Sequence, residues 1–359
     1  MQKLIIADSS AIWLEHIQLI NESYKESVTN SDIYYKMRTE LFYFNASKKK
    51  AGGIMEYEYK VTKKSKRKRQ STLAKNTDSG VLKLKENIEI FLEKLREMGT
   101  FADFTEVSTP MLQRYWEEGH IFPTFSGLNY TNEFQKFSFG EQIYIIPAFS
   151  KFFNHDVTKL NDIIDKLQIY DLIIIDPPWH NKYVKRLKRL KLELAYYMLD
   201  STEIYQLPIE KLINRHTLVA IWCTNAPQNQ RALLERFIPA WNLRLLQSVR
   251  WMKLTTRGTL IGNINDEGKK QPYEMLYIAC HKEEQRDFSS LQAVELLISI
   301  PSIIHSHKPP LLRWLQEYLP AKPKCLELFA RYLQPHFTSI GLEVLKLMDE
   351  RLYERIDKK

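Results

Sequence analysis

Residues 170–179 read Tyr-Asp-Leu-Ile-Ile-Ile-Asp-Pro-Pro-Trp, so a polar loop follows directly on a short, mostly apolar run. An apolar run of this length, over residues 170–175, is typical of a strand that is buried on both faces of a parallel sheet. Ligands of such sheets bind beyond the carboxyl ends of the strands. Residues 176–179 are therefore predicted to lie at an active-site edge.

The same texture continues on both sides of this segment. From about residue 138 onward, short apolar runs alternate with stretches of helical periodicity, which predicts an α/β domain with a largely parallel sheet. Pro310 is placed for the first turn of its helix. The predicted strands are residues 143–146, 218–223, 244–251, 275–280, 296–300 and 325–329, and the predicted helices are residues 160–167, 228–237 and 310–318.

The loop at residues 176–179 has side chains that suit methylation of an aromatic amine. The exocyclic amine of adenine is a poor nucleophile, so a catalyst must hold it with its lone pair turned towards an electrophile. Asp176 can accept one N–H and the carbonyl of Pro177 the other, while Pro177 and Pro178 stiffen the loop. Trp179 offers a flat face for a base that has left its stack. The alternative is a rigid turn that contains a buried Trp.

The bulk composition narrows the class of protein. The 359-residue chain has 44% hydrophobic and 26% charged residues, as in a globular protein, and a net charge of +9 that favours a polyanionic partner. Cys223, Cys280 and Cys325 are isolated, which argues against a disulfide framework or a zinc module. No metal site and no membrane span are expected, and the apolar run at the N-terminus is too short for a signal peptide.

Residues 1–135 are expected to form an accessory region, and residues 136–359 the catalytic domain. The first part contains a predicted amphipathic helix over residues 82–98 and a basic, flexible loop over residues 46–80. Residues 63–69, Lys-Lys-Ser-Lys-Arg-Lys-Arg, match a nuclear-import signal or a phosphate-binding arm, and equally a solvated loop. We expect a nuclear protein, with the cytoplasm as the alternative.

Four further segments accompany the loop in a fixed order. They are Asp156-Val157, residues 222–225 (Trp-Cys-Thr-Asn), residues 305–310 (His-Ser-His-Lys-Pro-Pro) and residues 326–331 (Leu-Glu-Leu-Phe-Ala-Arg) with Gln334-Pro335 behind them. Over residues 140–347 this set resembles the adenine-N6 methyltransferases related to the seventy-kilodalton catalytic subunit of the mRNA N6-adenosine methyltransferase. The run Lys-Gln-Pro-Tyr-Glu at residues 270–274 is similar to the branch of methyltransferase-like protein four.

The resemblance implies a Rossmann-like class I methyltransferase fold, in which the catalytic loop precedes the main cofactor segment, and S-adenosylmethionine as the methyl donor, with S-adenosylhomocysteine as product. Asp156 and Val157 would hold the cofactor adenine. Lys308 would pair with the methionine carboxylate and Asp176 would lie near the methionine amine, which supplies the cation and anion that a zwitterion needs. The ribose and methionine side would be lined by Glu327, Leu328, Phe329 and Arg331. Arg331 alternatively forms a salt bridge to Glu327 one helical turn away.

Two positions depart from the family pattern. Tyr332 stands where a small polar residue is usual, and Leu342 where an Asn usually reaches the cofactor ribose. Leucine cannot form that hydrogen bond, so we expect weaker cofactor binding, with Glu343 as a replacement ligand.

A dense basic segment follows the catalytic loop and is expected to steer a phosphate backbone. Its candidate contacts are Asn181, Lys182, Lys185 and Arg186, with Lys188, Arg189 and Lys191 behind them. Tyr273 and Glu274 are expected in a second substrate loop flanked by Lys253, Arg257, Lys269 and Lys270, although Tyr273 fits equally in the core.

The branch implies 2′-O-methyladenosine in small nuclear RNA as the substrate, with DNA adenine as the alternative. A monomer is expected, and a heterodimer with an inactive partner stays open. Other readings are a catalytically silent RNA-binding relative, a methyltransferase for protein or small-molecule amines, and a basic adaptor without a cofactor.

Overall fold

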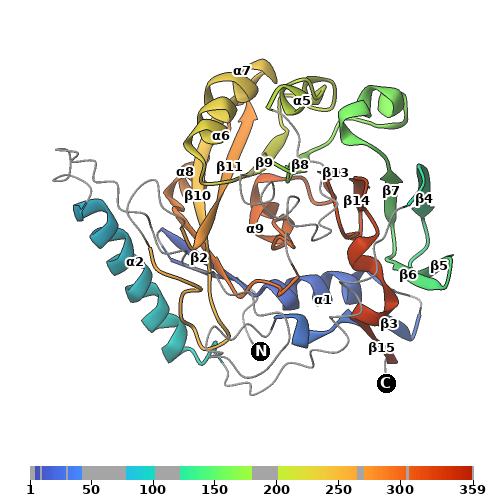
Figure 1. The fold of residues 1–359 in the computed structure, drawn as a ribbon, viewed down its shortest axis with the longest axis horizontal. Coiled ribbons are helices and arrows are strands. Elements are labelled where there is room, and N and C mark those ends of the chain that lie inside the picture. The colour runs from blue at the N-terminus through green and yellow to red at the C-terminus, as the bar shows by residue number, and fades with distance from the viewer. Residues whose placement is uncertain are drawn as a thin grey trace, which may run out of the picture.

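The computed structural model describes residues 5–8, 10–29, 31–42, 78–101, 122–179, 201–264, 271–304 and 307–357. Its centre is an eleven-stranded sheet flanked by helices (Figure 1). From one edge to the other the strands are β1 (Ile5–Ala7), β2 (Ala11–Leu14), β12 (Leu296–Ser299), β10 (Leu243–Lys253), β11 (Tyr273–His281), β9 (Leu218–Cys223), β8 (Leu172–Ile175), β13 (Cys325–Leu328), β14 (Phe337–Ile340), β7 (Ser150–Asn154) and β4 (Phe125–Asn129).

Strand β8 lies in the middle of a parallel block. It pairs in parallel with β9 on one side and β13 on the other, and β13, β14 and β7 continue the parallel order. Strands β2, β12 and β10 form a second parallel block. Between the blocks β11 runs antiparallel to both neighbours, and β1 and β4 add antiparallel edges. The predicted α/β class with a largely parallel sheet is confirmed.

The side chains of β8 explain why this run has no polar alternation. Ile173 and Ile175 pack into one apolar cluster, and Leu172 and Ile174 into another on the opposite face of the sheet. All four residues are buried. Burial on both faces selects a continuous β-branched and apolar run, because neither face meets water.

The other elements are short. The helices are α1 (His16–Ser27), α2 (Asp78–Glu97), α5 (Ser201–Tyr205), α6 (Pro227–Ala232), α7 (Ile238–Ala240), α8 (Ser289–Ala293) and α9 (Leu312–Leu315), and the 3-10 or π turns are η1 (Thr39–Phe42), η2 (Val157–Lys166), η3 (Ile209–Lys211), η4 (Leu233–Phe237), η5 (Gln316–Tyr318), η6 (Lys346–Met348) and η7 (Glu350–Leu352). Two small sheets pair β3 (Ile33–Met37) with β15 (Tyr353–Asp357), and β5 (Gln135–Phe139) with β6 (Gln142–Ile146).

Several predicted elements change in detail. The helix expected at residues 310–318 begins only at Leu312, so Pro310 precedes its first turn, and it continues as the 3-10 turn η5. The helix expected at residues 160–167 is the 3-10 helix η2. Most of the basic loop predicted at residues 46–80 lies outside the described residues.

The N-terminal segment takes part in the central sheet. Strand β2 pairs in parallel with β12, and β3 pairs with β15 near the C-terminus. The blue segment in Figure 1 accordingly lies against the orange and red parts of the chain. The division at residues 135 and 136 stays a prediction about folding units, although strands from both sides of it share one sheet.

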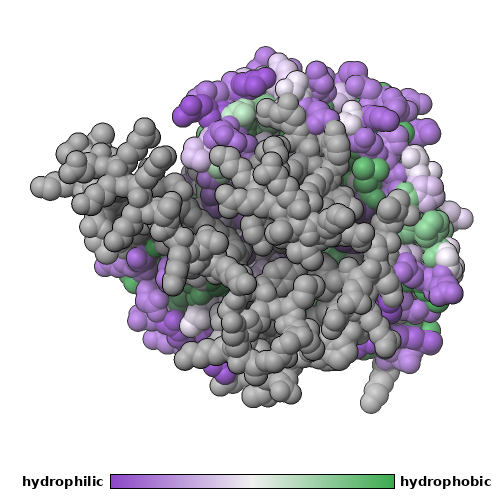
Figure 2. Space-filling view, viewed as in Figure 1, coloured by the Kyte–Doolittle hydropathy of each residue, from purple (hydrophilic) through white to green (hydrophobic). Residues whose placement is uncertain are grey.

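The β4 edge of the sheet carries partly exposed apolar side chains. Leu128, Phe139, Ile143 and Phe149 belong to this group. Figure 2 shows hydrophobic residues on the side of the molecule where β4, β6 and β7 lie, within a largely hydrophilic rim. Strand β4 lies four strand positions from β8, the strand that Asp176 follows.

Gly341 marks the tightest backbone approach at the end of β14. A Cβ atom there would lie 2.7 Å from the carbonyl oxygen and 3.0 Å from the nitrogen of Ala330. Both are backbone atoms of the segment that follows β13, so they cannot turn away as a side chain can.

We predict that Gly341→Ala destabilises the fold by about 1–3 kcal/mol, because the added methyl group forces the ends of β13 and β14 apart. Urea unfolding of the full chain measures this change. Leu342→Ala is the matched control, because Leu342 is 52% exposed and its truncation should cost less than about 0.5 kcal/mol. Equal unfolding midpoints for the two variants would contradict the packing argument.

Candidate active site

The predicted site residues come from strand ends at one edge of the sheet. Asp156, Asp176 and Arg331 follow the parallel strands β7, β8 and β13, and Glu343 follows β14. Glu274 reaches the same edge from the opposite direction, because β11 is antiparallel and Met275 pairs with the last residue of β9. Strand polarity therefore gathers residues that are far apart in the sequence at one edge.

An ion pair between Asp176 and Lys308 is at the centre of this edge. The Nζ atom of Lys308 donates to Oδ1 of Asp176 at 2.9 Å and to Oδ2 at 2.8 Å. A second carboxylate, Oε2 of Glu274, lies 3.3 Å from the same nitrogen. Glu274 also pairs with Lys253, so the four side chains form one alternating chain of charges.

The surroundings keep Lys308 charged although it is only 8% exposed. Burial by itself would lower the pKa of Lys308, but the carboxylates of Asp176 and Glu274 hold the pKa above its usual range. The ring of Trp222 adds a cation–π contact, with its centroid 5.5 Å from Nζ. Lys308 is thus a permanent buried cation.

Residues 176–179 form a turn that is fixed at both ends. The amide of Trp179 donates to the carbonyl of Pro177 at 2.7 Å, and the amide of Asp176 donates to the carbonyl of Leu328 at 3.4 Å. The indole Nε1 of Trp179 donates to the carbonyl of Trp222 at 2.8 Å. Trp179 is thereby tied to β9, and Asp176 to β13.

The ring of Trp179 is less open than the sequence suggested. It is 7% exposed and lies parallel to Phe237, with ring centroids 6.1 Å apart. One face is therefore occupied by the protein, as in the alternative of a buried Trp. A base can use only the other face or the edge of the ring.

Glu327 is a buried carboxyl group beside the central ion pair. Its Oε2 accepts a hydrogen bond from Nε2 of Gln334 at 2.9 Å. Burial raises the pKa of Glu327 to about 8; the negative charge of Asp176 adds to this effect, whereas Gln334 and Lys308 oppose it. Without a ligand this group is largely protonated at neutral pH.

Arg331 pairs with Glu343 across the ends of β13 and β14. Its Nε lies 3.2 Å from Oε2 of Glu343, and Nζ of Lys346 lies 2.6 Å from Oε1. Burial would raise the pKa of Glu343, but Lys346 and Arg331 lower it below its usual value. The predicted helical spacing of Arg331 to Glu327 is wrong, since residues 325–328 form a strand.

The segment after β13 turns sharply. Phe329 has a φ of 62°, in the left-handed region, which reverses the chain directly after the buried Leu328. Leu328 faces the core, so only its backbone is available at the sheet edge. Leu342, which stands where the family usually has an Asn, is 52% exposed.

Asp156 and Val157 lie at some distance from Asp176. Asp156 caps η2 by accepting from the amide and hydroxyl of Thr158 at 3.0 Å and 2.8 Å, and Val157 is buried. Because β13 and β14 stand between β8 and β7, the two ends of the site are about 14 Å apart at ordinary strand spacing. The edge is suited to an elongated ligand laid across four strands.

Of the residues predicted to bind the substrate, the structure describes Tyr273 and Glu274. Glu274 is engaged with two lysines, and the carbonyl of Tyr273 accepts from Nδ2 of Asn225. Asn181, Lys182, Lys185 and Arg186 lie outside the described residues, as do Lys188, Arg189, Lys191, Lys269 and Lys270.

Some residues at this edge had no role assigned from the sequence. They are Gln334, Lys346 and His16. Gln334 pairs with Glu327 seven residues away, and His16 contacts His307 on a distant segment, so no local spacing indicates these two contacts. Lys346 pairs with Glu343 three residues away, a spacing that the sequence does contain. Among the described residues no helix is long and apolar enough to cross a membrane, and no cluster of His, Cys, Asp or Glu could hold a metal ion.

The chain is similar in sequence to several proteins that are named as adenine-N6 methyltransferases. The METTL4 N(6)-adenine-specific methyltransferase of Homo sapiens is 36% identical over 213 residues, which are 57% of this chain and 44% of that protein. The DNA N6-methyl methyltransferase of Caenorhabditis elegans is 34% identical over 217 residues, 60% of this chain and 57% of that protein. The N6-methyladenosine RNA methyltransferase MTA1 of Pyricularia oryzae is 31% identical over 188 residues, 50% of this chain and 48% of that protein.

The chain spans about half the length of the curated relatives it matches. The MT-A70 family profile matches residues 170–343, which run from the start of the apolar segment before Asp176 to Glu343. This range contains the ion pair and the ends of β8, β13 and β14, so the part of the chain that carries the site, residues 170–343, is a domain of the MT-A70 family.

Proposed function

We propose that this protein transfers a methyl group from S-adenosylmethionine to N6 of adenine in a nucleic acid. The observation that carries the proposal is the buried ion pair of Asp176 and Lys308 at the carboxyl edge of the sheet. MT-A70 methyltransferases use S-adenosylmethionine, and the relatives named above are described as N6-adenine enzymes. This ion pair is consistent with that donor, because the methionine end of S-adenosylmethionine carries one positive and one negative charge.

The residues along this edge offer a suitable group for each part of the cofactor. Lys308 is held as a cation for the methionine carboxylate, and Asp176 is the matching anion for the methionine amine. The ribose hydroxyls would meet Glu327, and the adenine would lie near Asp156 and the backbone of Val157. Leu328, Phe329, Arg331 and Glu343 complete the strand ends between them.

When bound, the cofactor supplies a methyl group on a positively charged sulfur. Asp176 and the carbonyl of Pro177 accept the two N–H groups of the adenine amine and so orient its lone pair. Positioning of this kind and the exclusion of water supply the main part of the acceleration. Pro178 stiffens the turn, and the base would border the part of Trp179 that does not face Phe237.

Asp176 has to share its oxygens for this to happen. Each oxygen accepts one hydrogen bond from Lys308, and a carboxylate oxygen has two lone pairs, so each can also accept a ligand N–H. Glu274 offers Lys308 a second carboxylate while Asp176 is shared with the ligand. The buried cation therefore never loses all its compensation, which would cost several kcal/mol.

For the substrate we favour RNA, and within it 2′-O-methyladenosine of small nuclear RNA. The basic residues after Trp179 and the net charge of +9 support a phosphate backbone as partner. DNA is the second candidate, because one relative is named a DNA N6-methyl methyltransferase. We further propose that the enzyme is a monomer. Residues 63–69 would serve as its signal for import into the nucleus.

Replacement of Asp176 tests the mechanism. Asp176→Ala should abolish methyl transfer, because the amine of adenine loses its acceptor, and it should leave RNA affinity within a factor of about three. Transfer of labelled methyl from S-adenosylmethionine and RNA binding by fluorescence anisotropy measure the two quantities. Asp176→Asn, which keeps the shape, should also lose most activity, and the exposed Asp165→Ala is the matched control. Full activity in either Asp176 variant would exclude this mechanism.

A matched set of oligonucleotides tests the substrate. One sequence is made as RNA and as DNA, each with and without a 2′-O-methyl group on the target nucleotide. We expect the highest kcat/KM for the 2′-O-methylated RNA. Faster methylation of the DNA would overturn the RNA assignment but leave the N6 chemistry intact, and RNA binding without methylation of any oligonucleotide would favour a silent relative.

The pH dependence of cofactor binding tests Glu327. Its pKa of about 8 in the free protein means that a ligand whose hydroxyls need a carboxylate acceptor must first displace the proton. Affinity for S-adenosylhomocysteine should therefore rise with pH from 6 towards 8 and level off above it. Glu327→Gln should flatten this profile, whereas the exposed Glu283→Gln should not change it. Titration calorimetry that shows a flat wild-type profile would contradict the role of Glu327.

A further inference from the structure

The N-terminal segment reaches the catalytic edge through His16. Strand β2 runs parallel to β12, which in turn is parallel to β10, so the carboxyl end of β2 lies at the same edge as Asp176. His16 follows that end as the first residue of α1 and is only 1% exposed. The N-terminal segment thus places a buried imidazole at the edge where Asp176 and Lys308 of the family domain lie.

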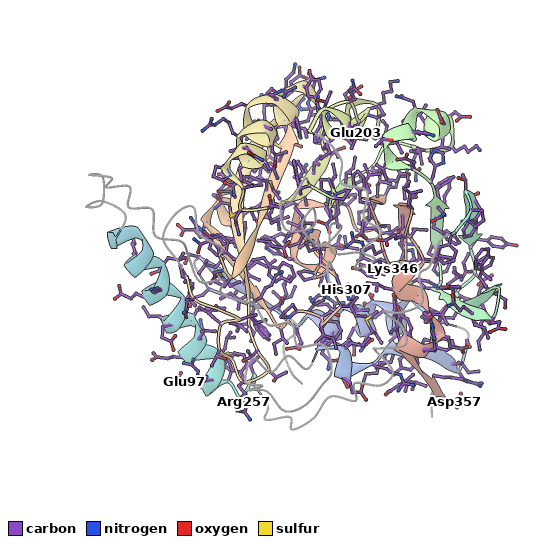
Figure 3. All side chains as sticks on the ribbon, viewed as in Figure 1. Glu97, Glu203, Arg257, His307, Lys346 and Asp357 are labelled. Atoms are coloured by element: carbon purple, nitrogen blue, oxygen red, sulfur yellow. The ribbon has the colours of Figure 1, made fainter. Side chains whose placement is uncertain are left out.

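His16 contacts the residue next to the central lysine. Its ring lies edge to face on the ring of His307, with centroids 5.1 Å apart. His307 is 2% exposed and directly precedes Lys308. In Figure 3 the labelled His307 lies beside α1, below the strand ends of the catalytic edge.

Two more rings close the space around His307. Phe42, at the end of η1, lies 4.9 Å from His16 and 5.9 Å from His307 between centroids. Tyr332, which departs from the family pattern, lies 4.9 Å from His307 between centroids. His307 therefore contacts two rings of the N-terminal segment and one of the family domain.

The electrostatics require the two imidazoles to be neutral. Burial lowers the pKa of His16, and the nearby His307 and Lys253 add to the effect, while the backbones of Lys308 and Ile300 oppose it. Burial and the charge of Lys308 lower the pKa of His307 to about 3. The pair therefore packs against the lysines without repelling them.

We propose that His16 is a positioning residue: through its ring contact with His307 it fixes the segment that presents Lys308 to the cofactor carboxylate. This inference rests on the proposed function of Lys308. It gives the first 42 residues a part in cofactor binding, because a side chain is held in productive geometry only when the residues behind it are themselves locked by packing. In this proposal His16 acts through the ring of His307 and the backbone of Lys308, and it makes no contact with the ligand.

Cofactor affinity separates this role from general support of the fold. His16→Ala in the full chain should weaken binding of S-adenosylhomocysteine about tenfold or more, whereas His16→Phe, which keeps a ring against His307, should stay within about threefold of wild type. Leu19→Ala is the matched control, since Leu19 is 4% exposed on the same helix and belongs to a different apolar cluster. Leu19→Ala should lower the melting temperature about as much as His16→Ala does, without lowering the affinity for S-adenosylhomocysteine.

Steady-state kinetics provide the second readout. For His16→Ala the KM for S-adenosylmethionine should rise, while the KM for the oligonucleotide stays unchanged. Equal cofactor affinity in His16→Ala and Leu19→Ala, or equal loss in His16→Ala and His16→Phe, would overturn the proposal.

Lys308→Gln distinguishes the two levels of the argument. If Lys308→Gln binds S-adenosylhomocysteine like wild type, the proposed function of Lys308 fails. If Lys308→Gln loses affinity while His16→Ala does not, only the role of His16 fails. In the Lys308→Gln background the additional effect of His16→Ala should vanish, because its effect is expected to pass through the lysine.

Discussion

Lys308 keeps its charge where almost no water reaches it, and the arrangement of the catalytic edge follows from that requirement. A buried ammonium group must have carboxylates within contact distance, and Asp176 and Glu274 provide them from two strands of opposite direction. The aromatic ring of Trp222 completes the surroundings of the cation. The carboxyl edge of the sheet can thus receive a zwitterion, since Lys308 can pair with its anionic group and Asp176 with its cationic group.

The same requirement connects parts of the chain that are far apart in sequence. Asp176 depends on β8 and on the carbonyl of Leu328, Glu274 on β11, and Lys308 on the segment after β12. Strand β12 itself is paired with β2, so the N-terminal segment supports the strand that leads to Lys308 as well as the ring of His307. The site and the N-terminal part of the sheet are one packing problem.

The sequence predicted the fold class and the polar turn after β8 because both are local. A buried parallel strand must be apolar without alternation, and a rigid polar turn after it is visible in ten consecutive residues. The strand runs at residues 218–223 and 275–280 were equally clear for this reason.

What the sequence missed depends on direction and contact. Nothing in residues 273–281 reveals that this strand runs against its neighbours, so the sequence did not predict that Glu274 pairs with Lys308 and Lys253. Strands of three and four residues, such as β1 and β2, are too short for a periodic pattern, and the contact of His16 with His307 spans 291 positions. The openness of Trp179 was overestimated because Phe237, its stacking partner, comes from another element.

Because β11 runs antiparallel to its neighbours, the connection that leads into it lies at the same edge as Asp176. Strand β10 ends at the catalytic edge with Lys253, and β11 begins there with Tyr273, so the connection between them starts and finishes beside the ion pair. The residues proposed to hold the cofactor, Asp156, Glu327 and Arg331, lie on the other side of β8, at the ends of β7 and β13. The connection between β10 and β11 therefore borders the ion pair without sharing a strand end with the proposed cofactor residues. Its length and charge can differ without altering those strand ends.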